Sequence, residues 1–539
     1  MVSRLISTLS LIFILCAGGG EVAARDASFG TLHRGNGAEP DTLDPQKAAL
    51  VSESVIIRDL FTGLTTLDSK GRIIPGAAEN WEVSEDGKRY VFHIRDDMVW
   101  SDGMSVTADD FVFAFRRLLD PMTGAEYATI LYLLENGEDV NLGRKPPTAL
   151  GAAALGPKTL EVRLHTPVPY LLEMFTHAST YPAPRHVVEE HGKDWVKPGR
   201  MVSNGAFMLS GWEPQNFVRV VANPEYHEAP SVKLDEVFYY PTSDDSSAVK
   251  QFRAGELDIN TSFPARQYKW LEENLPGEAR IHPWLGVYYY ALNSERPPLD
   301  DRRVRLALSM TIPREEIATK LLGYGVLPAY NFVPPGVENY TEFHTIDTAA
   351  PFSGLSAEDR REEARRLLAE AGYSEDNPLE VTISYNTSKD HKKIALAAAW
   401  GWKKIGVVTR LLNMEAKVHY NNLKVADFEV ARAGWIADFS DAQNFLFLLE
   451  SDTGPLNYGQ FSNPDFDRLM KEAGRTLDLD ERADLMARAE RIAMAEQPVA
   501  PIYFYVSRNL VAPWVEGFED NARNVHPSRY ISISGPRRR

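Results

Sequence analysis

Cysteine is almost absent from this chain of 539 residues. The only one, Cys16, lies inside an apolar segment near the N-terminus, "LISTLSLIFILCAGGG". A chain with one cysteine forms no internal disulfide, and a chain that loses this segment has no thiol for catalysis. No later apolar run approaches the roughly 20 residues that span a bilayer. The rest of the sequence therefore predicts a soluble, disulfide-free protein.

Excess positive charge and the common catalytic motifs are also missing. The formal net charge is −17 and the pI is about 5.3, which argues against nucleic acid as a partner. The patterns GxxxxGK[ST], GxSxG and HExxH do not occur. In "HVVEEH" (186–191) the two histidines are five residues apart, about 140° around a helix, so they cannot share a face. We expect no enzyme, no metal and no other cofactor.

The N-terminus has the pattern of an export signal. Arg4 precedes the apolar segment, and Val22 and Ala24 occupy the −3 and −1 positions of a signal peptidase site. Cleavage is expected after Ala24, with residues 1–24 as the signal peptide. Lipoprotein attachment at Cys16 is disfavoured because Leu15 is bulky where a small residue is expected. The expected location is the periplasm.

Strand and helix patterns alternate along the remaining chain. Apolar residues recur with period two at 88–97, 159–165, 216–221, 234–240 and 379–385. Amphipathic helices are predicted at 356–372 and 479–498, and another begins with Thr107 as N-cap and Asp110 three residues later. The length and this mixture predict an α/β protein with mixed sheets in more than one domain.

The stretch "FEVARAGWIADFSD" (428–441) places two opposite charges in an apolar run. In a strand, Arg432, Gly434, Ile436 and Asp438 would share one face, and Trp435 would lie on the other. The six residues from Arg432 to Asp438 span roughly 20 Å as a strand. Such a pair could hold an extended ligand with a charge at each end. The alternative is a separate internal salt bridge for each residue.

Consecutive aromatic residues occur in "VYYYALN" (287–293) and "IYFYV" (502–506). Both segments are predicted strands. Their rings could belong to the core, or some of them could line a cavity with their hydroxyl groups free for water or ligand.

Long segments in order along the chain resemble the oligopeptide-binding proteins of bacterial ABC importers, within the peptide/nickel family of extracellular solute-binding proteins. They are "RGNGAEPDTLDP", "SESVIIRDLFTGL", "WSDGMSVTADDFVFAFRRLLDP", "VSNGAF", "PPLDDRRVRLAL", "YNTSKDHKK", "ARAGWIADFSD" and "PIYFYV". The resemblance implies an α/β, two-lobed (Venus-flytrap) binding protein with mixed sheets and an extra domain, the three-domain cluster C type. The implied division is domain I at 25–61, 186–285 and 506–539, domain II at 62–185, and domain III at 286–505, with hinges near 185 and 286.

The resemblance also implies a ligand site. Asp438, with the main-chain carbonyl of Ile436, would hold the α-amino group of a peptide, and Arg432 and His391 would lie near its carboxylate. The segment 48–51 would be a strand flanking the ligand. The remaining implied positions are Gly434 on the Arg432 face, the aromatic residues Tyr127, Tyr289, Trp435 and Tyr505, and, within the flanking segment, Ala49, Leu50 and Val51.

Some positions depart from the family pattern. Ala416 stands where a tryptophan is usual, and Leu423 and Leu322 stand where cations are usual. Gly286 and Ile436 replace the two cysteines of the best-known members. These changes would enlarge one side pocket and weaken capture of some carboxylates.

The function implied is capture of short peptides between the lobes and delivery to an inner-membrane ABC permease, by a protein expected to be a monomer. The alternative ligands are murein peptides or another solute such as a nickel chelate, heme or an opine.

Overall fold

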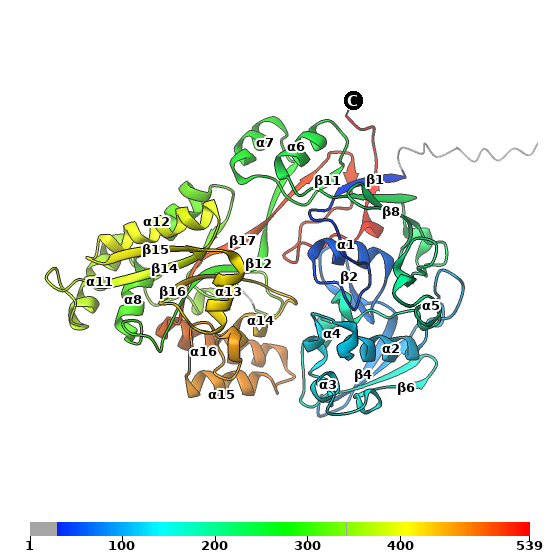
Figure 1. The fold of residues 1–539 in the computed structure, drawn as a ribbon, viewed down its shortest axis with the longest axis horizontal. Coiled ribbons are helices and arrows are strands. Elements are labelled where there is room, and N and C mark those ends of the chain that lie inside the picture. Colours follow the sequence, from blue (N-terminus) through cyan, green and yellow to red (C-terminus); the bar gives the residue numbers. More distant parts are fainter. Residues whose placement is uncertain (1–29, 341, 539) are drawn as a thin grey trace, which may run out of the picture.

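The structure, a computed structural model, describes residues 30–340 and 342–538. The predicted signal peptide, Cys16 and the cleavage site after Ala24 lie outside these residues. Two lobes stand side by side (Figure 1). Each has its own hydrophobic core. The C-terminal lobe packs residues between 285 and 506. The core of the N-terminal lobe consists of residues between 32 and 271, others between 510 and 533, and Phe439, which reaches it from the C-terminal lobe. The chain is therefore an α/β protein in two lobes, as predicted.

One mixed sheet of eleven strands runs through both lobes. Its order is β15 (Val408–Met414), β14 (Glu380–Asn386), β16 (Val430–Ile436), β12 (Ala279–Leu292), β17 (Val499–Val511), β11 (Ile259–Asn260), β1 (Thr31–Gly35), β10 (Glu236–Tyr240), β9 (Phe217–Ala222) and β8 (Phe207–Glu213), with β13 (Leu327–Pro328) paired to β17. The lobes are thus two halves of one sheet rather than separate bodies on a linker.

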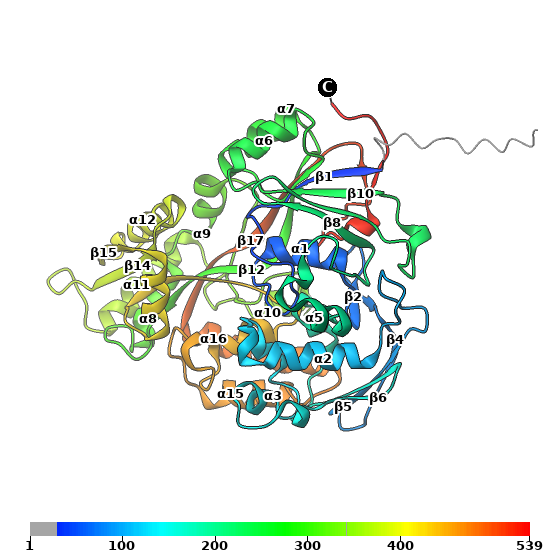
Figure 2. The ribbon, with the colours of Figure 1, turned by 45° about the vertical axis from the view of Figure 1, so that its right-hand side comes forward.

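Two long strands cross between the lobes. β12 and β17 pair antiparallel from Ala279 opposite Leu510 to Ala291 opposite Val499. Their register shifts between Pro283 and Val287, at the point where the strands leave one lobe for the other. A register shift interrupts the ladder and locally increases twist. This β12–β17 ribbon is the covalent and hydrogen-bonded connection between the lobes (Figures 1 and 2).

A second, smaller sheet belongs to the N-terminal lobe. It has the order β4 (Ala78–Val83), β5 (Arg89–Ile94), β7 (Thr159–Arg163) and β6 (Ala152–Gly156), and α2 (Ala108–Leu119) packs on β6 and β7 (Figure 2). The predicted start of α2 is confirmed, because the Thr107 amide donates to Asp110 Oδ2 at 2.8 Å.

Period-two and helical patterns located most elements correctly. The five strands predicted between 88 and 385 are confirmed as β5, β7, β9, β10 and β14, and the two long helices as α11 (Ala357–Glu370) and α16 (Leu479–Glu496). The other helices named below are α1 (Val51–Leu60), α4 (Leu171–Met174), α5 (Arg185–His191), α12 (Lys389–Lys403), α13 (Ala416–Lys424) and α14 (Gln443–Leu446). Within the described part of the chain, no helix is both long and apolar enough to cross a lipid bilayer.

Two expectations about local structure were wrong. The segment 48–51, called the 48–51 loop below, is not a strand: residues 48–50 form a loop that leads into α1 at Val51. The reason is Glu53, a buried side chain that accepts hydrogen bonds from the amides of Ala49 and Leu50, both at 2.8 Å. The lobes also do not connect near residue 185. Arg185 begins α5, whose residue Val187 packs in the core of the N-terminal lobe.

The lobes also touch through side chains beside the ribbon. Tyr170 of the N-terminal lobe stacks on Phe439 of the C-terminal lobe, with ring centroids 4.9 Å apart. Glu173 on α4 accepts the amide of Ser440 at 3.2 Å and pairs with both terminal nitrogens of Arg523 at 2.6 Å. Arg523 also reaches Glu338 of the C-terminal lobe at 3.3 Å. Burial and the nearby Glu173 carboxylate raise the pKa of Glu338. One arginine therefore holds two carboxylates from opposite lobes.

We expect Arg523→Ala to lower the free energy of unfolding by about 3–5 kcal/mol, because it leaves the buried Glu173 carboxylate unpaired. Urea denaturation measures the loss. The matched control is Arg72→Ala, which removes an exposed ion pair with Asp68 and should cost at most about 1 kcal/mol. Equal losses for the two variants would show that the Glu173–Arg523 pair stabilises the protein no more than an exposed ion pair does.

Candidate functional site

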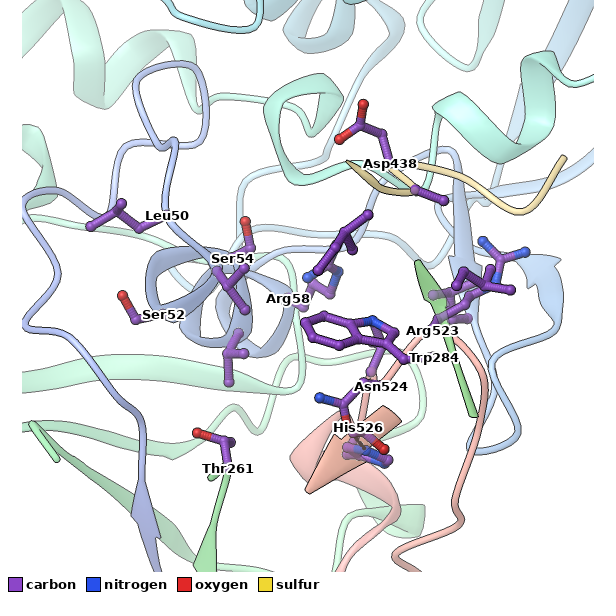
Figure 3. Close-up of a pocket in the computed structure, with 18 of the residues that line it drawn as sticks. Leu50, Ser52, Ser54, Arg58, Thr261, Trp284, Asp438, Arg523, Asn524 and His526 are labelled. Carbon is purple, nitrogen blue, oxygen red and sulfur yellow. Dashed lines mark hydrogen bonds between the residues drawn. The ribbon is translucent and has the colours of Figure 1, made fainter. Parts of the chain in front are cut away.

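A cavity of about 560 Å³ lies between the lobes where the ribbon crosses (Figure 3). The N-terminal lobe contributes the 48–51 loop, one face of α1 and Tyr127. The C-terminal lobe contributes the last residue of β16 and the three residues that follow it, from Ile436 to Phe439. Trp284 and Arg508, on the ribbon, and the segment 523–527 complete the wall. A space walled by both lobes changes shape whenever the lobes move relative to one another.

Asp438 lies at the C-terminal end of β16, two residues beyond its last residue. Its amide donates to Asn444 Oδ1 on α14 at 3.1 Å, and the same oxygen accepts Trp435 Nε1 at 3.0 Å. The carboxylate faces water in the cavity but has protein on most sides and forms no ion pair with any described residue. This desolvation raises its pKa to about 6. The proximity of Asp438 contributes to the raised pKa of Tyr127 across the cavity.

The edge of β16 next to Asp438 has no partner strand among the residues that the structure describes. Parallel β14 pairs only with Val430 and Ala431, whereas β12 pairs along the whole of β16. Ala437 donates to the carbonyl of Leu285 at 2.9 Å, and antiparallel strands alternate such bonds residue by residue. The amide and carbonyl groups of Gly434 and Ile436 therefore point away from β12. An extended chain could add to the sheet along this edge.

Arg432 lies on the same face of β16 as Gly434 and Ile436, within a cluster of tyrosines. It donates to Tyr420 Oη at 2.9 Å and to Tyr505 Oη at 3.0 Å, and its guanidinium lies 4.9 Å from the ring centre of Tyr288. No described carboxylate pairs with it, although the residue is only 8% exposed. The alternative considered for Arg432 and Asp438, a separate internal salt bridge for each, is thus not found among the described residues.

His391 reaches the same cluster from α12. Its Nδ1 lies 3.3 Å from Tyr288 Oη. Burial and the positive charge of Arg432 lower the pKa of His391 to about 4. The ring is therefore neutral near pH 7 and can offer a carboxylate a hydrogen bond but no charge.

The sequence-predicted site residues fall into three groups. Ala49, Leu50, Val51, Tyr127, Ile436 and Asp438 line the cavity. Arg432, His391, Gly434 and Tyr505 form the tyrosine-rich cluster. Trp435 and Tyr289 are directed to the opposite face of the sheet, where they pack against Phe447 and Phe332, and Tyr289 is buried. Leu423 is also a core residue with no exposed surface, so it borders no side pocket.

The sequence interpretation missed several residues of the cavity wall. They are Ser54, Val55 and Arg58 on α1, Trp284 and Arg508 on the ribbon, and Asn524 and His526 near the C-terminus. A signal existed for the first three. With Val51 they follow the spacing i, i+3, i+4, i+7 of a single helical face. The others come from segments whose meeting depends on the tertiary fold.

The sequence of residues 72–457 matches the family model of bacterial extracellular solute-binding proteins, family 5. The chain belongs to this family. Among curated relatives, the periplasmic oligopeptide-binding protein OppA of Escherichia coli is 39% identical over 492 residues, 90% of this chain and 89% of the relative. Family 5 members are binding proteins rather than enzymes.

Two solved structures of family 5 members bear on the arrangement of the lobes. The unliganded open form of the murein tripeptide binding protein MppA, from E. coli, is 37% identical and has a TM-score of 0.85, with 94% of this chain and 97% of the other covered. Haemophilus influenzae OppA in complex with RPPGFSPFR is also 37% identical, but its TM-score is 0.76, with 94% and 99% covered. At equal identity, the lobes here match the open form better.

Gly434 allows Arg432 to reach Tyr505. A Cβ at this position would lie 2.7 Å from Tyr505 Oη and 3.2 Å from Arg432 Nη2. We expect Gly434→Ala to lower the free energy of unfolding by about 1–3 kcal/mol through overpacking. Gly211→Ala is the control, since its nearest neighbours would be 3.7 Å away. In denaturant titrations Tyr505→Phe should relieve part of the Gly434→Ala loss; strict additivity of the two changes would contradict this explanation.

Proposed function

We propose that this family 5 protein captures short peptides between its lobes in the periplasm and delivers them to an inner-membrane ABC permease. The peptide-binding relatives and the interlobe cavity support this function. The observation that carries the binding mode is Asp438, a cavity-facing carboxylate that forms no ion pair with any described residue and lies at the end of the unpaired edge of β16. That arrangement complements a peptide, which is an extended chain with an ammonium group at one end.

In this mode the peptide adds to β16 as a strand. Its main chain bonds to Gly434 and Ile436, and its ammonium group lies between the Asp438 carboxylate and the Ile436 carbonyl. Its carboxylate is directed toward Arg432, which has a planar fork of donors, and neutral His391 contributes a hydrogen bond. Main-chain contacts do not depend on side-chain identity. Peptide sequence would then matter through the side chains that line the cavity, Tyr127 among them.

In this binding mode Trp435 and Tyr289 act indirectly: they pack on the opposite face of the sheet and stabilise it. The 48–51 loop would approach the peptide from the N-terminal lobe on closure. We also propose cleavage of the export signal after Ala24, a monomeric state, and the three-domain division given by the resemblance. Murein peptides stay the alternative ligand, since a murein-binding relative is similar over nearly the whole chain, with 98% of it covered.

Blocking the peptide amine should abolish most of the affinity. Calorimetry with a free and an N-acetylated peptide of the same sequence should give a difference of about 2–5 kcal/mol, because acetylation leaves Asp438 facing an uncharged amide. Asp438→Asn should bind the free peptide weakly and discriminate little between the two. Equal binding of both peptides to the unaltered protein would reject amine capture by Asp438.

Affinity should fall as the pH falls through 6. Free Asp438 has a pKa of about 6, above the ordinary value of 3.8, so below pH 6 an ammonium ligand must displace a proton. We expect binding to weaken about tenfold between pH 7 and pH 5. His391, with a pKa of about 4, and the buried His177 and His526, with pKa values of about 3, stay neutral over most of this range. Calorimetry on Asp438→Asn should give a nearly flat profile; an unchanged slope would assign the dependence to another group.

A further inference from the structure

The cavity has an excess of positive charge, although the chain as a whole carries −17. Of the described residues that line it, four are arginines (Arg34, Arg58, Arg508 and Arg523) and only Asp438 is a carboxylate. Glu173 and Glu338 neutralise Arg523. The other three arginines form no ion pair with any described carboxylate. The wall therefore holds three uncompensated cations against one uncompensated anion, with Arg432 nearby as a fourth cation.

Arg58 is the uncompensated cation on the N-terminal lobe. It lies on the cavity face of α1 with Ser54 and is directed toward the space below Asp438 (Figure 3). Its Nε atom is buried without a hydrogen-bond partner. Burial, together with the positive charge of Arg58, lowers the pKa of His177 to about 3, so His177 is neutral near pH 7 and adds no second cation beside Arg58.

Arg508 and Arg34 extend the positive wall. Arg508 is half-buried on β17, and its guanidinium lies 5.1 Å from the ring centre of Tyr324, a contact that provides no counter-charge. Arg34 is 2% exposed and donates only to the carbonyl of His526, at 2.8 Å, while its Nε has no partner. Arg508 therefore keeps donors and charge available at the cavity, whereas Arg34 adds positive charge to the wall from a buried position.

A peptide without charged side chains does not balance this cavity. Its ammonium group compensates Asp438 and its carboxylate compensates one arginine, which leaves at least two arginines uncompensated when the lobes close. Removing unpaired charges from water costs several kcal/mol per ion. Additional carboxylates on the ligand would replace that cost with charge-assisted, bidentate hydrogen bonds.

We propose that the preferred ligands are acidic peptides, which carry side-chain carboxylates besides the terminal one, and that Arg58 and Arg508 select them. This inference rests on the proposed peptide-binding function and adds the chemical class of peptide. Arg58 would act from the N-terminal lobe and Arg508 from the ribbon. Side-chain charge would then be recognised by elements other than β16, which holds the main chain.

The test is competition between isosteric peptides. Purified protein is incubated with an equimolar library of three- to six-residue peptides in which each glutamate peptide has a glutamine counterpart, and bound peptides are quantified by mass spectrometry. We expect at least tenfold enrichment of glutamate over glutamine peptides. Arg58→Gln and Arg508→Gln should each reduce that ratio several-fold, whereas Arg72→Gln, at an exposed pair outside the cavity, should leave it unchanged.

Three results would overturn the proposal, and they separate its failure from that of the peptide-binding function. Binding of both series in a ratio near one would reject acidic selection and leave peptide binding intact. A high ratio unaffected by both cavity variants would assign selection to other residues. No retained peptide of either series would reject peptide binding and this inference together. Thermal unfolding confirms that the variants are folded, which is expected since each removes an unpaired cation.

Discussion

The antiparallel pairing of β12 with β17 is the constraint on which the rest of the molecule depends. These strands are separated by more than two hundred residues of sequence, yet their ladder joins the cores of both lobes and sets the position of the cavity. β16 pairs with β12, so Asp438 and Arg432 are placed by the same ribbon. Trp284 and Arg508 are themselves part of it. The interruption of the ladder at Pro283–Val287 puts its weakest point between the lobes.

Around this ribbon, open and closed arrangements differ in how charge is exposed to water. In the open arrangement, solvent reaches Asp438, Arg58 and Arg508 through the cavity, so their charges are tolerated. Closure without a ligand would remove that water and leave the charges unpaired. A ligand with matching charges removes the penalty and therefore favours closure, which is the differential affinity that a shift between two states requires. Glu173, Arg523 and Glu338 supply a charged contact between the lobes beside the ribbon.

Local patterns in the sequence were sufficient for most strands and helices, and for the face on which Arg432 and Gly434 lie, because side-chain alternation is a property of the strand alone. They were not sufficient for the 48–51 loop, whose amides are captured by Glu53, nor for Tyr289, since consecutive aromatic residues do not indicate which face of a sheet is covered. The helical spacing of Ser54 and Arg58 could be read from the sequence, but the wall that they form with Arg508 exists only once distant segments meet in the fold.

The backbone of the ribbon controls how tightly the protein binds its ligands, whereas side chains in the cavity control which ligand it prefers. Any substitution that lies outside the cavity and stiffens or twists β12 and β17 changes the free energy of closure by the same amount for every ligand. Affinities for all ligands would then rise or fall together while their ranking stays constant. Ranking depends instead on a few side chains such as Arg58 and Arg508. Chains descended from this one could therefore adapt to high or low ligand concentrations through changes in the ribbon alone. Their order of preference among ligands would not change.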